Sequence, residues 1–113
     1  MPEASHADEI PPGTLYLLIL KTLARHGELH GYDIARSIRD VSDAVLQVEE
    51  GSLYPALQRM LRKGWVTAEW GTTHTNRRAR FYRLTREGRA QLEAELSQFR
   101  RVVGAIGRVI ESV

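Results

Sequence analysis

Basic side chains gather in one part of this chain, where they could hold a negatively charged partner. Residues 59–89 contain nine arginine and lysine side chains but only two acidic ones, whereas residues 1–50 contain four basic and nine acidic side chains. Arginine suits phosphate groups in particular, because its planar fork of N–H donors can bind two oxygens at once. This division of charge indicates a polyanionic partner, and the alternative is a basic face that contacts only water.

Part of this charge falls on a predicted helix within EGSLYPALQRMLRKGWV, residues 50–66. At about 100° per residue, one face of this helix is apolar and consists of Leu53, Leu57, Met60 and Leu61. The opposite face carries Pro55, Gln58, Arg59 and Arg62. We expect Ser52 to cap the helix, so that Pro55 lies near the third helical position, where a missing N–H costs nothing. We expect Gly64 to end the helix.

Two helices are predicted before this segment. The first begins at Thr14 and ends at Gly27, and it is apolar nearly all round, so we expect a second subunit to cover part of it. The second begins near Gly31, and the spacing of Ile34, Ile38 and Val41 is that of a buried stripe. Residues 42–51 are expected to connect the second helix to the third.

A β-hairpin and a last helix are predicted after it. Residues 65–70 and 79–85 are rich in strand formers, and residues 71–78 between them would form a cationic tip. Thr85 is expected to cap the last helix. Apolar residues alternately four and three apart continue along that helix for about three heptads, which is typical of a coiled-coil seam. They are Leu92, Leu96, Phe99, Val103, Ile106, Ile110 and Val113.

These elements predict a mainly α fold with a small β-hairpin, in the order α-α-α-β-β-α of a winged helix-turn-helix. We divide the chain into a disordered lead over residues 1–13, a winged helix-turn-helix domain over 14–84 and a C-terminal dimerisation helix over 85–113. In such a module the third helix enters the major groove of duplex DNA, and the hairpin lies along the backbone or in the minor groove.

Other chemistries have little support in the sequence. The chain contains no cysteine, and the pair His26 and His30 has zinc-binding spacing but no further ligand cluster beside it. There is no glycine-rich phosphate loop and no nucleophile motif, so we expect neither an enzyme nor a cofactor. No apolar run approaches the ~20 residues that span a bilayer, and the first residues are unlike a secretory signal. We therefore expect a cytoplasmic protein without a membrane partner.

Four segments together resemble the PadR family of bacterial transcriptional regulators. They are HGYDI at 30–34, GSLYPALQRM at 51–60, RKGWV at 62–66 and NRRARFYRLTREGRAQL at 76–92. The resemblance covers roughly residues 13–113 and implies a winged helix-turn-helix, a homodimer built through the first and last helices, and usually repression of a nearby promoter. It also implies DNA contact by Tyr32, Tyr54, Pro55 and the Asn-Arg-Arg of the hairpin tip. Trp65 departs from the family, which more often has a smaller aliphatic residue there, and the single C-terminal helix is short.

We therefore predict a homodimeric regulator, a repressor that binds a pseudo-palindromic operator in double-stranded DNA. The predicted DNA contacts are Tyr32, Ser52, Tyr54, Pro55, Gln58, Arg59, Arg62, Lys63, Thr75, Asn76, Arg77 and Arg78. The predicted dimer contacts are Leu15, Leu18 and the seven seam residues.

Several alternatives stay open. Arg80 and Arg83 alternate on a strand with Tyr82, so some of these side chains must face the core or the solvent. Trp65 and Trp70 are expected in core or dimer packing rather than in stacking on a ligand. A small hydrophobic or aromatic effector could lie between subunits beside Leu15, Leu18, Trp65 and Phe99, or the same residues could form a closed dimer core. The rival function is a winged-helix module that binds an acidic protein instead of DNA.

Overall fold

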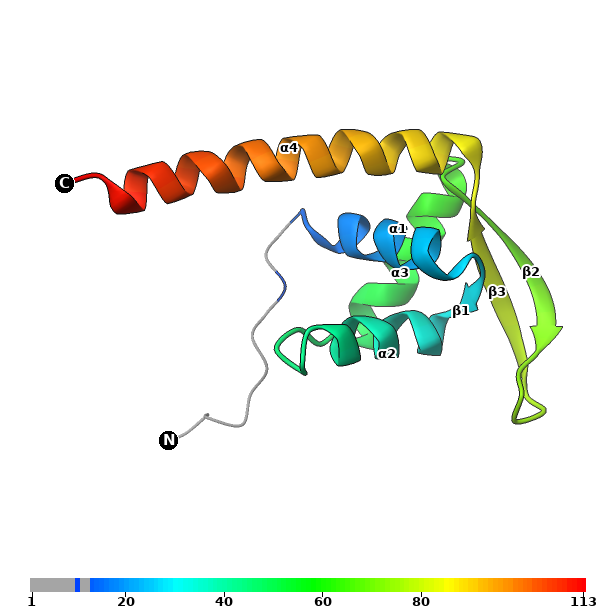
Figure 1. Cartoon of the computed structure of the whole chain (residues 1–113). Coiled ribbons are helices and arrows are strands. Elements are labelled where there is room, and N and C mark those ends of the chain that lie inside the picture. Colours follow the sequence, from blue (N-terminus) through cyan, green and yellow to red (C-terminus); the bar gives the residue numbers. More distant parts are fainter. Residues whose placement is uncertain (1–9, 11–12) are drawn as a thin grey trace.

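The computed structural model describes residue 10 and residues 13–113, and it has the expected order of elements (Figure 1). The expected lead over residues 1–13 therefore lies mostly outside the described residues. The elements are α1 (Leu15–His26), β1 (Leu29–His30), α2 (Gly31–Val41), α3 (Glu50–Arg62), β2 (Val66–Thr72), β3 (Arg78–Leu84) and α4 (Arg86–Glu111). The winged helix-turn-helix is thus confirmed, with a two-residue strand β1 that was not predicted.

The three strands form one antiparallel sheet in the order β1-β3-β2. The register pairs Leu29 with Tyr82 in β1 and β3, and Trp70 with Arg80 in β2 and β3. The hairpin tip spans only residues 73–77, so the expected eight-residue tip was too long. The tip is tight because the Thr73 N–H donates to the Arg77 carbonyl at 2.7 Å and the Arg77 N–H donates to Thr73 Oγ1 at 3.1 Å. Strand pairing therefore extends further toward the tip than composition indicated.

The hydrophobic core lies between α1, α2, α3 and one side of the sheet. Its fully buried side chains include Ile19, Leu20, Leu23, Ile34, Leu53, Leu57 and Met60. Gly27 ends α1 as expected, with a φ of +88° that favours glycine. Thr14 stands at the N-cap of α1, but its side chain does not cap the helix. Val41 is 61% exposed, so the predicted buried stripe of α2 ends at Ile38.

The start of α3 differs from the prediction. The Glu49 carbonyl accepts the N–H groups of Ser52 and Leu53, both at 2.9 Å, so the helix begins at Glu50. Ser52 is therefore the third helical residue and not the cap, and Pro55 is the sixth. At that position proline lacks an N–H that would otherwise donate to the Gly51 carbonyl. The two faces of α3 are nevertheless as predicted, because Leu53, Leu57 and Met60 are buried and Leu61 is half-buried.

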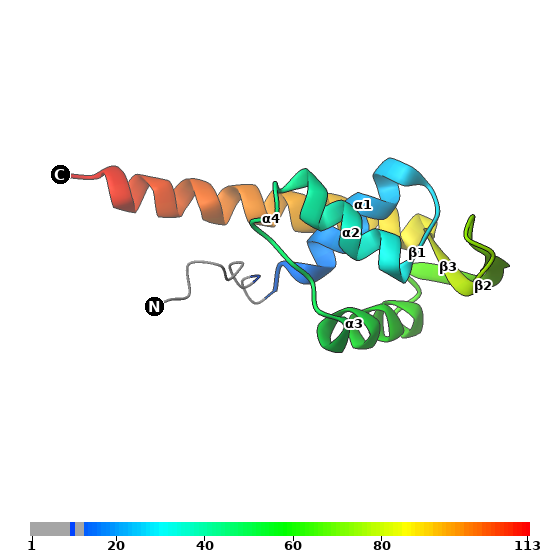
Figure 2. The same cartoon turned by 90° about the horizontal axis from the view of Figure 1, so that it is seen from below.

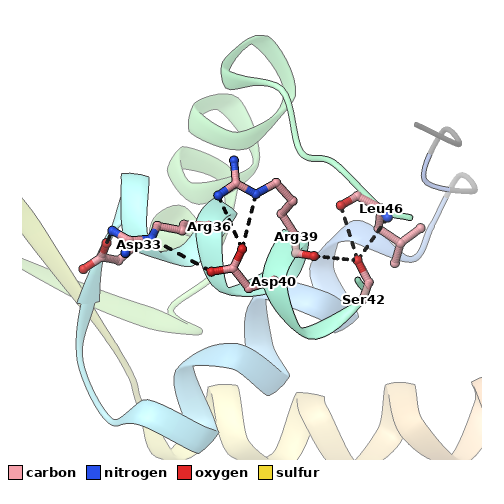
Figure 3. Close-up of polar contacts among 6 residues, drawn as sticks. All are labelled: Asp33, Arg36, Arg39, Asp40, Ser42 and Leu46. Carbon is pink, nitrogen blue, oxygen red and sulfur yellow. Dashed lines mark hydrogen bonds and ion pairs between the residues drawn. The ribbon is translucent and has the colours of Figure 1, made fainter. Parts of the chain in front are cut away.

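The turn between α2 and α3 is held by the side chain of Ser42 (Figure 3). Ser42 Oγ accepts the Leu46 N–H at 3.0 Å and lies 3.2 Å from the Arg39 carbonyl. Asp43 and Ala44 both have positive φ values, 55° and 65°. This turn reverses the chain so that α3 can pack across α1 and α2 (Figure 2).

The last helix begins where the sheet ends. Thr85 caps α4, since Thr85 Oγ1 accepts the Gly88 N–H at 2.9 Å, and the same hydroxyl donates to the Gly64 carbonyl at 2.6 Å. Leu92 is buried, and Leu96 packs against the core. The C-terminal part of the helix extends past the other helices and strands, as Figures 1 and 2 both show. The longest dimension of the molecule is 56 Å as a result.

Candidate nucleic-acid interface

A hollow of about 740 Å³ lies where the start of α2, the outer face of α3 and the hairpin converge. Six of the predicted DNA contacts line it although they come from three separate elements. They are Tyr32, Tyr54, Gln58, Thr75, Arg77 and Arg78. The hollow therefore joins the helix face and the hairpin tip into one concave surface.

The other six predicted contacts do not line the hollow. Ser52, Pro55, Arg59, Arg62, Lys63 and Asn76 are all exposed. The Nε of Arg59 donates to Tyr16 Oη on α1 at 2.5 Å, and the Lys63 ammonium lies 5.3 Å from the Trp65 ring. These two cations are thus directed along the side of α3 toward α1 and Trp65. Asn76 has a φ of 66°, a conformation that asparagine tolerates, and it shapes the hairpin tip.

Tyr54 connects α3 to the first residue of α2. A Cβ on Gly31 would lie 2.8 Å from both Cε1 and Oη of Tyr54, so only glycine allows this ring to approach so closely. Burial raises the pKa of the Tyr54 hydroxyl, and the negative charge of Glu50 and the neighbouring Tyr82 add to this effect. The hydroxyl therefore stays protonated at neutral pH and can donate a hydrogen bond. The role of Gly31 was not predicted, because its contact with Tyr54 leaves no local signal in the sequence.

His30 positions the start of α2. Its Nε2 lies 3.2 Å from the Asp33 carboxylate, and its ring stacks on Tyr32 at 6.5 Å between centroids. His26 instead lies 3.3 Å from the Ser37 hydroxyl. In the part of the chain that the structure describes, no three potential metal ligands come together.

The arginines of α2 and of the opposite side of β3 are engaged in ion pairs, whereas those of α3 and the hairpin tip are not. Arg36 lies between Asp33 and Asp40, and Arg39 lies 3.3 Å from Asp40 (Figure 3). Arg83 lies 3.5 Å from Glu28. Over residues 13–113, none of the ion pairs involves Arg62, Arg77 or Arg78. Among the described residues no acidic side chain pairs with Arg77 or Arg78, so the hollow that they line carries positive charge that is not balanced by an ion pair.

The two tryptophans have different surroundings. Trp65 is half-buried and packs edge to face on Tyr16 at 5.4 Å between centroids, in line with the expected packing role. Trp70 is 61% exposed and lines the hollow, so of the expected core or dimer packing the core packing was wrong for it. The guanidinium groups of Arg78 and Arg80 lie 4.9 and 5.9 Å from its ring. This arrangement follows from the register that pairs Trp70 with Arg80, which the sequence alone does not give.

The predicted dimer contacts also divide into two groups. Leu15 and Leu18 are half-buried beside the core, and Leu92 is 6% exposed within its own subunit. The remaining seam residues beyond Leu96 are exposed, and they are Phe99, Val103, Ile106, Ile110 and Val113. An apolar stripe of this size on a projecting helix is the kind of surface that a partner normally covers. No helix among the described residues is long and apolar enough to cross a membrane.

Comparison with known proteins agrees with this architecture. The model of the transcriptional regulator PadR-like family matches residues 19–94, which is more than half of the chain. A transcriptional regulator from Clostridium thermocellum is 25% identical, with a TM-score of 0.79 over 88% of this chain and 95% of that one. A PadR family regulator from Eggerthella lenta is 27% identical, with a TM-score of 0.73 over 89% and 85% of the two chains.

A third similar structure is Bacillus subtilis PadR in complex with operator DNA. It is 29% identical to this chain, with a TM-score of 0.66 over 77% of this chain and 48% of that one. Members of this family are regulators rather than enzymes. The match over α1 to the first part of α4 shows that the chain belongs to the PadR-like family of transcriptional regulators.

Proposed function

We propose that this chain binds duplex DNA as a homodimer and represses transcription from a pseudo-palindromic operator. The observation that carries the proposal is the hollow, in which side chains of α2, α3 and the hairpin converge on one cationic surface. The related Bacillus subtilis protein was solved in complex with operator DNA, which supports DNA as the partner of this chain.

Within this surface we assign different roles to the helix and the hairpin. Gln58 faces the hollow from the middle of α3, where it could read base edges in the major groove. Tyr32 and Tyr54 can donate their hydroxyls to phosphates, and Arg77 and Arg78 can bind the backbone beside them. The exposed residues along the rest of α3 and the tip would extend this contact, and they are Ser52, Pro55, Arg59, Arg62, Lys63, Thr75 and Asn76.

The dimer follows from the exposed stripe of α4, together with Leu15 and Leu18 beside it. Two such helices related by a two-fold axis would bury their stripes against each other and present two copies of α3 to the same side of a duplex. The half-sites would then lie about one helical turn, ~10 bp, apart. A small hydrophobic effector between subunits and a cytoplasmic location complete the proposal.

The test is a titration of the purified protein with duplex DNA from upstream of its own operon, measured by fluorescence anisotropy. We expect binding that weakens steeply with salt, and Arg77→Ala should reduce the salt slope by about 1 per bound subunit. Arg25→Ala, on the exposed end of α1, is the matched control and should leave the slope unchanged. Gln58→Ala should alter the preference among sequences more than the slope.

Failure to bind any duplex in dilute buffer would exclude this function and favour a module that binds an acidic protein. Repression has a separate readout, a reporter gene driven by the upstream region, whose expression should rise when the protein is deleted. Release of the DNA by added aromatic compounds would identify the effector class.

A further inference from the structure

The side of the hairpin that faces the core continues beyond the core. Val66, Ala68, Tyr82 and Leu84 alternate along β2 and β3 on this side and pack against the helices. Because side chains alternate strictly along a strand, Trp70 and Arg80 lie on the same side one step nearer the tip. There the helices no longer cover the sheet, since Trp70 is 61% exposed. An inward-facing surface is thus left open toward the hollow.

The guanidinium of Arg80 lies near two aromatic rings on this surface. Its guanidinium lies 5.9 Å from the ring of Trp70 and 5.9 Å from that of Tyr82, which is itself buried. Among the side chains of the described residues, Arg80 Nε is the one buried nitrogen or oxygen atom without a hydrogen-bond partner. Buried donors in folded proteins are nearly always paired, so this unpaired N–H marks Arg80 as a side chain whose donors the chain itself does not satisfy.

The surroundings of Arg80 favour an anionic acceptor. The hollow is lined by Arg36, Arg77 and Arg78 as well as Arg80, and its one acidic side chain is Asp33. Asp33 already faces His30 at 3.2 Å and Arg36 at 3.9 Å. A phosphate oxygen would supply the missing acceptor and offset the charge of the arginines together.

We propose that Arg80 binds a backbone phosphate of DNA inside the hollow, between the hairpin and α3, and that Trp70 is the positioning residue that holds it there. This inference rests on the proposed function, and it adds a contact that neither the hairpin tip nor the face of α3 provides. A guanidinium fixed on two rings loses little freedom on binding, so its contact should depend on arginine and not on positive charge alone.

The test compares Arg80→Met with Arg83→Met on a labelled duplex of arbitrary sequence, because phosphate contacts do not depend on sequence. Arg83 is the matched control, since it lies on the opposite side of the same strand and is paired with Glu28. We expect Arg80→Met to weaken binding about fivefold per bound subunit at 0.15 M salt and to lower the salt slope by about 1 per subunit. Arg83→Met should change neither. Thermal unfolding of both variants checks that the fold is kept.

Two further measurements separate a fixed contact from a general charge effect. Arg80→Lys should keep the salt slope but still bind severalfold more weakly, because an ammonium group lacks the planar set of N–H donors of a guanidinium. In the wild-type protein, the Nε–H signal of Arg80 in a ¹⁵N NMR spectrum, assigned by its absence from Arg80→Lys, should shift when the duplex is added.

The outcomes distinguish this inference from the proposed function. If the wild-type protein ignores duplex DNA, both fail. If it binds but Arg80→Met behaves like Arg83→Met, only the Arg80 contact is refuted. The same holds if Arg80→Lys binds as tightly as the wild type, or if the Arg80 signal stays still while the duplex is bound.

Discussion

The two ends of α4 carry one continuous repeat in opposite surroundings. Near the sheet, Leu92 is 6% exposed, whereas Ile106 and Ile110 toward the C-terminus are 51% and 73% exposed. The glycines show the same contrast. A Cβ on Gly88 would lie 2.0 Å from the Trp65 carbonyl oxygen, but a Cβ on Gly107 would meet nothing within 4 Å. The near end of α4 therefore packs against its own subunit, whereas the far end has the same apolar repeat but no contact within the subunit that buries it.

A regular heptad repeat therefore does not distinguish residues that pack within their own subunit from residues that remain exposed. The first turns of α4 use the repeat to pack on α1 and the sheet, and the later turns continue it past the edge of the domain (Figure 1). Two side chains of the hollow differ in a similar way, because the ring of Tyr54 packs on Gly31 whereas the ring of Trp70 is exposed.

The largest expected effect comes from placing a charge on the far end of α4. Ile106→Asp should weaken the proposed dimer by at least about 100-fold, because two isoleucine side chains worth about 1.5–3 kcal/mol each would leave the interface. DNA binding should weaken with it, since the two copies of α3 would no longer be linked. Sedimentation velocity across a range of concentrations measures the change in association.

The control for this substitution is Arg108→Asp, which introduces a carboxylate about 200° away around the same helix. It should leave the dimer intact. A wild-type chain that sediments as a single subunit, or an Ile106→Asp variant that still dimerises, would contradict the assignment of the far end as the interface.

The second largest effect is expected from a substitution that disrupts packing at the near end of α4. In Gly88→Ala the new methyl group would overlap the Trp65 carbonyl, which also accepts the Thr85 N–H at 3.0 Å. Relieving this overlap must move the start of α4 away from Trp65, which directly precedes β2, at a cost of about 3 kcal/mol in the free energy of unfolding. Urea unfolding should show a lower midpoint with an unchanged slope. Gly104→Ala, whose Cβ would meet only the Arg108 guanidinium at 3.7 Å, is the comparison, and equal losses in both would refute this explanation.

These contacts also show what could be predicted from the sequence. Local signals placed the elements well, because Gly27, Gly64 and Thr85 act on the residues beside them. The start of α3 was missed by three residues, since Ser52 resembles a cap but the Glu49 carbonyl already begins the helix. The strand β1 was missed because two residues show no alternation.

The hollow was predictable only in part. Six of its side chains were named from charge and motif, but Trp70, Arg80 and Gly31 were not. Their roles depend on which residues lie opposite across the hairpin and between α2 and α3. Strand register and helix packing decide those pairs, and a reading of single segments contains no information about them.

A smaller effect is expected at the boundary of the hollow. Gly31→Ala should cost about 1–3 kcal/mol, because the added methyl group would displace the ring of Tyr54. In a Tyr54→Ala background the same change should cost almost nothing, so a double-mutant cycle by urea unfolding isolates the contact. Gly51→Ala near the start of α3 is the control, since its Cβ would meet nothing within 4 Å. Additive losses in the cycle would mean that Gly31 is required for another reason.

The smallest effect returns to the far end of α4 and asks whether its glycine has a purpose outside the subunit. In a monomeric Ile106→Asp background, Gly107→Ala should stabilise the fold by up to about 1 kcal/mol, because alanine is the better helix former and no atom obstructs it. In the wild-type dimer we expect a smaller gain, since a methyl group there would keep the partner helix from approaching closely. Thermal unfolding of the four proteins at fixed concentration compares the two gains. Equal gains in the two backgrounds would mean that Gly107 is not needed for close approach of the partner helix, and that only the apolar repeat forms the interface.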